Sequence, residues 1–148
     1  MEITRLFDFL TYQREKLPLT DALNTKQNGE WKATSSEEFY QQAHQITGAL
    51  IAMGVKPGDK IGMISTNNRT EWCVVDMGVL QLGAINVPVY PTIAAKDYEY
   101  ILNHSESQYC FVSDKEVYDK LVSVQKNVKG LKGVFCFDEI EGCTHWSS

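Results

Sequence analysis

The segment from Lys60 to Thr92, KIGMISTNNRTEWCVVDMGVLQLGAINVPVYPT, restricts the folds open to this chain more than any other part. The short apolar run from Lys60 to Ser65, bounded by turns, predicts a strand that is covered on both faces. An amphipathic helix pattern follows, and Ala84 to Tyr90 predicts a second strand. Strand, helix and strand in this order make a parallel crossover unit, which predicts an α/β sheet with ligands at the carboxyl ends of its strands.

The same alternation extends on both sides of this segment. It predicts helices over about 3–16, 35–53, 68–82, 94–103 and 115–128, and parallel strands over 60–65, 84–90, 108–113 and 133–137. The expected fold is α/β, an open, doubly wound and mostly parallel sheet with flanking helices and a small N-terminal hairpin. In domain terms we expect an N-terminal helix (1–18), a hairpin (19–34), βα units of a large domain (35–138) and a truncated tail (139–148) without a closing element.

The N-terminal part carries two local predictions. The first helix has a set of apolar residues that we expect to form its buried face: Leu6, Phe7, Phe9, Leu10 and Leu17. Pro18 should end that helix. Asn28-Gly29 then predicts a tight hairpin turn, since both central residues of such a turn take positive φ.

Capping and turn residues sharpen the later predictions. Ser35 with Glu38, and Asn68 with Glu71, each have the spacing of a reciprocal capping box at a helix start. Pro88 lacks the N–H that a ladder hydrogen bond needs, so we expect a bulge there or a strand that stops pairing one residue earlier.

Charge and composition exclude several classes of function. The net charge is −5, and the 14 basic residues are scattered, which argues against a nucleic-acid surface. No window is apolar enough for a membrane span, and the N-terminus lacks the apolar core of a signal peptide. We therefore expect a cytoplasmic protein with four reduced cysteines. Cys136, Cys143 and His145 lack a fourth ligand for zinc, so no metal site is predicted.

Two loops at the carboxyl ends of predicted strands are candidates for ligand contact. The loop from Ser65 to Asn68 leads into a helix N-terminus, which attracts anions, although helix capping explains the same residues. The turn at Tyr90 and Thr92 either lines a pocket or is only a rigid connection set by prolines. The candidate substrate-side residues are therefore Asn67, Tyr90 and Thr92, and no catalytic residue is assigned.

Several segments, taken in order, resemble the N-terminal part of AMP-forming acyl-CoA synthetases, especially the long-chain fatty-acid–CoA ligase branch of the adenylate-forming superfamily. The matching stretches are GALIAMGVKPGD (48–59), KIGMISTNNRTEW (60–72), LGAINVPVYPT (82–92), ILNHS (101–105) and FVSD (111–114). Each stretch is weak alone, but their order and spacing are specific.

The resemblance implies a reaction that uses ATP, Mg2+ and coenzyme A to convert a fatty acid into its acyl-CoA through an acyl-adenylate. It also implies that the phosphate-binding loop and the catalytic lysine lie downstream, so this polypeptide alone should be inactive. We further expect peripheral membrane association and self-association of the fragment. Two alternatives stay open: another adenylating enzyme, such as an aryl-acid ligase or a peptide-synthetase adenylation domain, and a standalone α/β module that binds a nucleotide or another anion.

Overall fold

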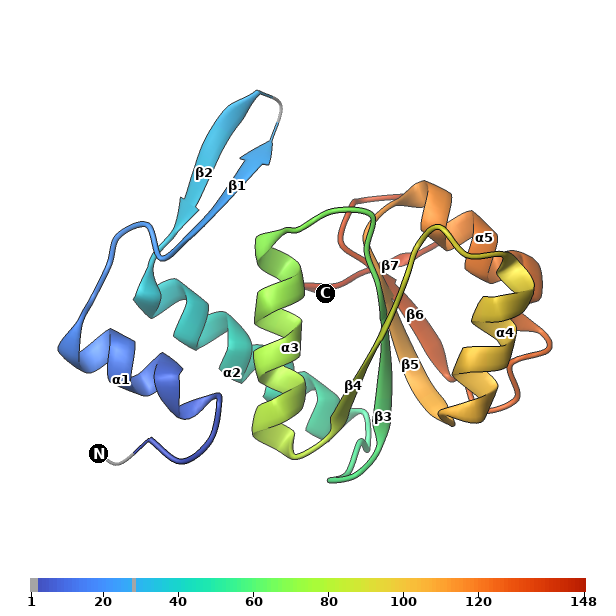
Figure 1. Cartoon of the computed structure of the whole chain (residues 1–148), viewed down its shortest axis with the longest axis horizontal. Helices are drawn as coiled ribbons and strands as arrows, with labels where there is room; N and C mark the ends of the chain where they lie inside the picture. Colours follow the sequence, from blue (N-terminus) through green and yellow to red (C-terminus); the bar gives the residue numbers. More distant parts are fainter. Residues whose placement is uncertain (1–2, 28) are drawn as a thin grey trace. The chain divides into compact units, whose positions relative to one another are not determined.

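The computed structural model describes residues 3–27 and 29–148, and Figure 1 shows its helices and strands. These residues form two compact units. Unit 1 comprises the described residues of 1–57 together with 68–84, and unit 2 comprises 58–67 together with 85–148. The chain therefore passes from unit 1 to unit 2, back and again to unit 2.

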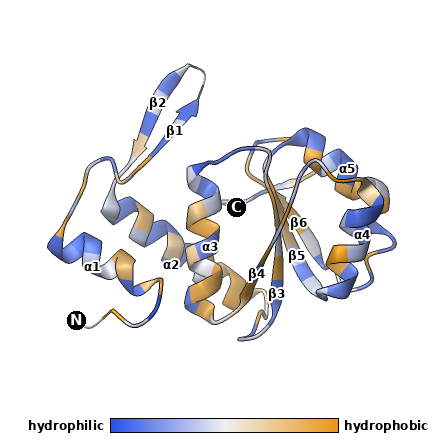
Figure 2. Cartoon of the chain, in the orientation of Figure 1, coloured by the Kyte–Doolittle hydropathy of each residue, from blue (hydrophilic) through white to orange (hydrophobic). Residues whose placement is uncertain are grey.

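Unit 1 is a helical body with a hairpin. Its elements are α1 (Asp8–Lys16), β1 (Leu23–Gln27), β2 (Glu30–Thr34), α2 (Ser36–Ala52) and α3 (Thr70–Leu82). Helices α2 and α3 make the main packing contact of the unit, and both helices contain many hydrophobic residues (Figure 2). Their buried apolar residues are Phe39, Ala43, Ile46, Leu50, Val74, Val75 and Val79. Ile51, which follows the buried Leu50 in α2, is exposed.

Helix α1 is shorter than the sequence predicts, because it begins at Asp8 and not near Ile3. The Asp8 carboxylate accepts hydrogen bonds from the backbone amides of Thr4 (3.1 Å) and Arg5 (2.9 Å), which holds the preceding residues in a turn. The predicted apolar face is also wrong for most of its members. Leu10 is buried, whereas Leu6, Phe9 and Leu17 are exposed.

The predicted hairpin is confirmed as two antiparallel strands. Leu23 pairs with Thr34 and Gln27 pairs with Glu30. Gly29 has a φ of 86°, the left-handed conformation that the turn chemistry requires. The other predicted turn residue, Asn28, lies outside the described residues.

The two predicted capping boxes have different outcomes. Ser35 and Glu38 form theirs at the start of α2: the Glu38 amide donates to Ser35 Oγ (3.2 Å), and the Ser35 amide donates to Glu38 Oε2 (2.7 Å). The box at Asn68 and Glu71 is wrong. The N-cap of α3 is Arg69, and its guanidinium binds the Glu71 carboxylate at 2.8 Å, so that carboxylate serves an ion pair.

The hairpin supplies the cap that α3 lacks. The backbone amide of Thr70, the first residue of α3, donates to Thr25 Oγ1 of β1 at 3.0 Å. The two threonine hydroxyls are also 2.8 Å apart. A tertiary contact thus satisfies one of the helix amides that otherwise lack an intrahelical partner.

Unit 2 is built on a parallel sheet. Its strands are β3 (Lys60–Ile64), β4 (Ile85–Val89), β5 (Ser107–Val112), β6 (Gly133–Cys136) and β7 (Thr144–His145). They lie in the order β4-β3-β5-β6-β7, and every neighbouring pair runs parallel. The parallel direction of β3 and β4, on which the predicted fold depends, is confirmed. Strand β7 corrects the expectation that the tail contains no further element.

Helices α4 (Ala95–His104) and α5 (Lys115–Gln125) lie side by side in unit 2 (Figure 1). They share one apolar core with the strands. Its buried members are Ile64, Val89, Tyr98, Leu102, Cys110, Val112, Val117, Leu121, Val128 and Cys136. The alternate residues of β5 and β6 form an aromatic row, in which the Phe111 and Phe135 ring centroids are 5.2 Å apart. Side chains thus pack on both faces of these strands, as in an α/β sheet.

Pro88 does not interrupt β4. The register is continuous, with Met63 beside Pro88 and Ile64 beside Val89, so the expected bulge or early stop is wrong. The physical reason is the position of β4 at an edge of the sheet, since it pairs only with β3 among the described strands. A proline on an edge strand can direct its nitrogen away from the partner and costs no ladder hydrogen bond.

Candidate functional site

The strand order locates the crevice at which parallel sheets bind ligands. From β3 the chain goes first to β4 on one side and then to β5 on the other. The direction of winding therefore reverses between β3 and β5, and ligands bind outside the carboxyl ends of strands at such a point. In unit 2 this point lies between the loop that begins at Ser65 and the loop that begins at Ser113.

A hydrogen-bond network joins these two loops. The Thr66 amide donates to Ser113 Oγ at 3.0 Å. The hydroxyls of Thr66 (2.7 Å) and Ser113 (2.6 Å) both donate to Asp114 Oδ2. The other carboxylate oxygen of Asp114 accepts from the Val117 amide at 3.1 Å and so caps α5. We call Thr66, Ser113 and Asp114 the edge network.

Asp114 is the charged member of the edge network. Partial burial raises the pKa of its carboxyl, but hydrogen bonds from Ser113, Thr66 and the Val117 amide outweigh this effect, and the pKa is lowered. The carboxylate is therefore ionised near neutral pH and attracts both hydroxyl protons. Ser113 is fully buried and Thr66 is exposed, so the network runs from the core to the surface.

The turn after β4 is held by two side chains from the helices of unit 2. The phenol of Tyr98 and the ammonium of Lys120 both donate to the Pro91 carbonyl, each at 2.7 Å. Lys120 also reaches the Ile93 carbonyl at 3.3 Å. Burial raises the pKa of Tyr98 to about 12, so its phenol remains a donor. The backbone of the turn is thus fixed, while the Tyr90 side chain is 80% exposed.

The structure places the predicted residues Asn67, Tyr90 and Thr92 on loops that follow the neighbouring strands β3 and β4. All three side chains are exposed. Asn67 lies next to the edge network, and its carbonyl accepts from Ser65 Oγ at 2.7 Å. No hydrogen bond joins the three predicted side chains to one another within the described residues. They share the carboxyl edge without forming a closed cluster.

Ser113, Asp114 and Lys120 were not among the residues predicted from the sequence, whereas Thr66 lies in the predicted candidate loop from Ser65 to Asn68. A usable signal exists for the network, because Thr66 and Asp114 follow directly after parallel strands, where the ends of neighbouring strands meet. No signal in the sequence identifies Lys120, which reaches the turn from the middle of α5.

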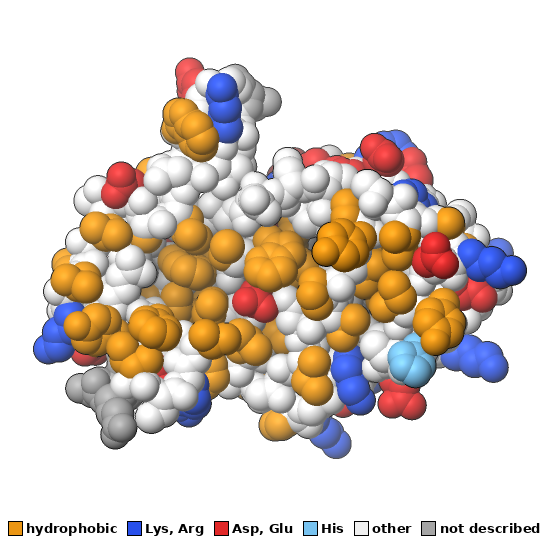
Figure 3. All heavy atoms as spheres, viewed as in Figure 1, with side chains coloured by type: hydrophobic (Ala, Val, Ile, Leu, Met, Phe, Trp, Pro, Cys, Tyr) orange, Lys and Arg blue, Asp and Glu red, His pale blue; other side chains and the backbone are white. Residues whose placement is uncertain are grey.

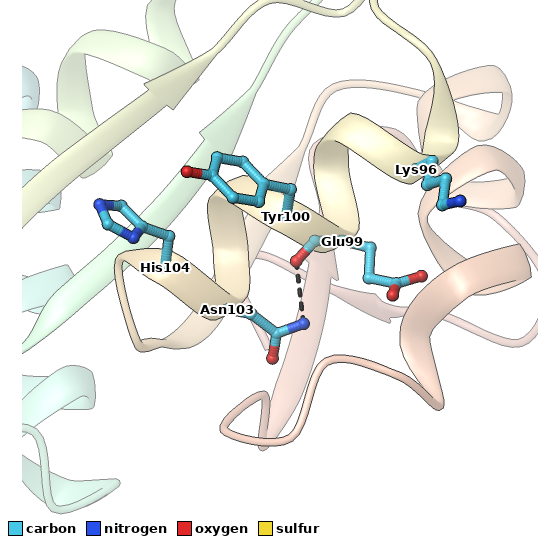
Figure 4. A pocket seen from close by; sticks show the side chains of 5 residues that line it. All are labelled: Lys96, Glu99, Tyr100, Asn103 and His104. Atoms are coloured by element: carbon cyan, nitrogen blue, oxygen red, sulfur yellow. Dashed lines mark hydrogen bonds between the residues drawn. The ribbon is translucent and has the colours of Figure 1, made fainter.

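A shallow hollow of about 460 Å3 lies elsewhere in unit 2, on the surface of α4 (Figure 4). It is lined by Lys96, Glu99, Tyr100, Asn103 and His104. Asn103 donates to the carbonyls of Glu99 (2.9 Å) and Asn127 (3.0 Å), and Tyr100 stacks on His104. The lining residues all come from one helix, and their hydrogen bonds and ring contact serve the packing of α4. We therefore assign no ligand to this hollow.

The part of the chain that the structure describes contains no group of three or more His, Cys, Asp or Glu residues placed to hold a metal ion. The four cysteines are free thiols. His145 Nε2 lies 3.0 Å from the Phe137 carbonyl, and the Cys143 thiol contacts the Val134 carbonyl at 3.5 Å. Over the same described residues, no helix has the length and hydrophobicity needed to cross a membrane.

Solved structures share this fold. An anthranilate CoA ligase in complex with anthranoyl-AMP matches with a TM-score of 0.79 at 22% identity, over 97% of this chain and 26% of that one. A fatty acyl CoA synthetase from Mycobacterium tuberculosis matches with a TM-score of 0.74 at 18% identity, over 88% of this chain and 26% of that one. The α/β fold with a parallel sheet and flanking helices is thereby confirmed.

The family itself is shown by sequence. The family model described as AMP-binding enzyme matches residues 10–146, and the chain belongs to this family. Fatty acyl-CoA synthetase A from Dictyostelium discoideum is 30% identical over 128 residues, which cover 86% of this chain. Long chain acyl-CoA synthetase 1 from Arabidopsis thaliana is 28% identical over 144 residues, or 94% of this chain. The chain spans only 19% and 22% of these two relatives.

Proposed function

We propose that this chain is the N-terminal segment of an AMP-forming fatty acid–CoA ligase that acts on long-chain substrates. The observation that carries the proposal is the family match over 10–146, joined to relatives that are described as long-chain acyl-CoA synthetases. The two-proline turn around Tyr90, which resembles that of the long-chain branch, supports the same assignment.

The proposed reaction has two steps. The carboxylate of the fatty acid attacks the α-phosphorus of ATP, which forms the acyl-adenylate and releases pyrophosphate. The thiol of coenzyme A then attacks the acyl carbon and displaces AMP. Both steps depend on positioning and on neutralising phosphate charge. We assign the carboxyl edge of unit 2 a part in positioning substrate, through Asn67, Tyr90 and Thr92, and assign no catalytic residue.

The described residues do not fit a Mg2+ site at this edge. Asp114 is the carboxylate of the edge network, and its oxygens already accept from Thr66, Ser113 and Val117. Mg2+ requires near-octahedral oxygen ligands, usually one or two carboxylates with water and phosphate. We therefore propose that Mg2+ acts in the whole enzyme without a ligand from the edge network.

Three further parts of the proposal concern the surroundings of the protein. We propose a cytoplasmic location, peripheral association with membranes that hold the fatty acid, and self-association of this chain. Both the membrane association and the self-association are supported by exposed apolar side chains near α1, which include Leu6, Phe9, Leu17 and Leu19 (Figure 3).

The test uses the complete product of the natural coding sequence. We expect AMP and pyrophosphate to form with ATP, coenzyme A and palmitate, and the 148-residue chain alone to release none. Release by the chain alone would refute its proposed inactivity. AMP formation with aryl acids or amino acids in place of fatty acids would instead favour another adenylating branch. A stop codon directly after Ser148 would favour the standalone binding module.

The candidate site has its own test in that complete enzyme. Tyr90→Ala and Thr92→Val should each lower kcat/KM for the fatty acid about tenfold if these side chains position substrate. Tyr100→Ala is the matched control, because Tyr100 is an exposed tyrosine that lies within helix α4 and not in a loop after β3 or β4. If kcat/KM for the fatty acid is the same in all three variants, Tyr90 and Thr92 do not position the substrate.

A further inference from the structure

Besides the exposed apolar side chains near α1, unit 1 has a second surface that can bind a partner, which is the outer edge of β2. In a hairpin with a two-residue connection, the pair that flanks the connection, here Gln27 and Glu30, exchanges hydrogen bonds, and the pattern alternates along the strand. The backbone groups of Trp31 and Ala33 therefore point away from β1. Within residues 3–27 and 29–148, neither residue makes a backbone hydrogen bond outside the hairpin. Such an edge is a template for another strand.

The side chains of β2 make the same edge unusual. Residues Glu30 to Ala33 are all exposed, and Trp31 is 71% exposed. The hairpin extends from the helices of unit 1 as a two-stranded ribbon (Figure 1). A two-stranded ribbon gains stability when further strands extend it.

We propose that the outer edge of β2 binds β2 of a second copy of this chain, antiparallel and centred on Trp31. In this register Trp31 faces Trp31 of the second copy, and Glu30 faces Lys32 of the second copy on both sides of the two-fold axis. Trp31 then uses its outward N–H and C=O in two ladder hydrogen bonds. The product is a four-stranded antiparallel sheet.

Charge complementarity selects this register. Centring the pair on Lys32 would place two lysines directly opposite each other, which is destabilising. Centring it on Trp31 places two opposite-charge pairs in non-hydrogen-bonded positions, where facing side chains are closest. A C2 contact of this kind is self-complementary and closes after two copies.

This inference names a surface for the proposed self-association but needs no ligase activity. The test is sedimentation of the full chain across a dilution series. The wild type should dimerise, and Glu30→Lys and Lys32→Glu should each weaken dimerisation about tenfold, because each variant places like charges opposite one another twice. An equimolar mixture of the two variants should dimerise like the wild type, since one copy then presents two lysines and the other two glutamates.

The double variant, which carries both changes in one chain, is the control for folding. It should also dimerise like the wild type, because the facing charges are opposite again. This control matters because Lys32→Glu can also disturb unit 1. Hydrogen bonds from Ser35 lower the pKa of Glu38. Against the raising effect of burial, the Arg69 guanidinium lowers the pKa of Glu71. The charge of Lys32 adds a smaller lowering effect on the pKa of both carboxyls. A monomeric wild type would overturn the proposal. Association that neither reversal alters would also overturn it and would leave self-association to the apolar surface near α1.

Discussion

Replacing Gly78 with alanine tests the packing of α2 against α3. A Cβ atom at position 78 would lie 2.6 Å from Ile46 Cγ2, 2.7 Å from Ile46 Cβ and 2.9 Å from the Ala43 carbonyl oxygen. Carbon atoms in contact normally lie about 3.5–4.0 Å apart. Because the Ile46 Cβ and the Ala43 carbonyl cannot rotate away, the helices must separate or bend by roughly 1 Å.

The expected cost follows from two opposing effects. Overpacking a well-packed core costs about 1–3 kcal/mol, and this site is at the upper end because backbone is one of the clashing groups. Alanine in a helix gains about 1 kcal/mol over glycine. The net loss should be about 2 kcal/mol, or a fall in Tm of about 4–8 °C for a chain of this size.

The matched control is Gly48→Ala in α2. Gly48 is also helical, but a Cβ there would meet nothing within 4 Å. This variant should gain the helix propensity of alanine without a clash, and its Tm should rise by about 2–4 °C. Thermal unfolding followed by circular dichroism measures both variants. If Gly78→Ala is as stable as the wild type while Gly48→Ala is stabilised, then α2 and α3 are not packed too tightly at Gly78 to accept a Cβ atom.

Three further changes test local contacts. Thr25→Val removes the hydroxyl that accepts from the first amide of α3, and unfolding in urea should show a loss of about 1 kcal/mol. The Arg5 guanidinium lowers the pKa of Asp8 from 3.8 to about 2. The Asp8 carboxylate therefore stabilises the fold above about pH 4, and this stability is lost as the pH falls towards 2. Asp8→Asn should flatten that part of the curve of Tm against pH. Tyr98→Phe removes a donor from the turn after β4, so amide exchange at Thr92 and Ile93 should become faster, whereas unchanged exchange would contradict the role given to the phenol.

Most of the fold could be predicted from local patterns. The parallel strands β3 and β4 follow from short apolar runs separated by a helical pattern, and the box at Ser35 and Glu38 follows from two residues three positions apart. The errors have tertiary causes. Asn68 lost its expected capping role to contacts made by Arg69 and by the hairpin, and Pro88 is tolerated because β4 lies at an edge of the sheet.

The candidate site shows the same division. The sequence alone determined that Asn67, Tyr90 and Thr92 follow strands, because turn residues and apolar runs act over a few neighbouring positions. Only the tertiary structure decided which strands are neighbours, and therefore that Thr66 meets Asp114 across 48 positions of the chain. Strand order depends on how whole elements pack, which no local pattern encodes. The family match shows that the chain belongs to the AMP-binding enzymes.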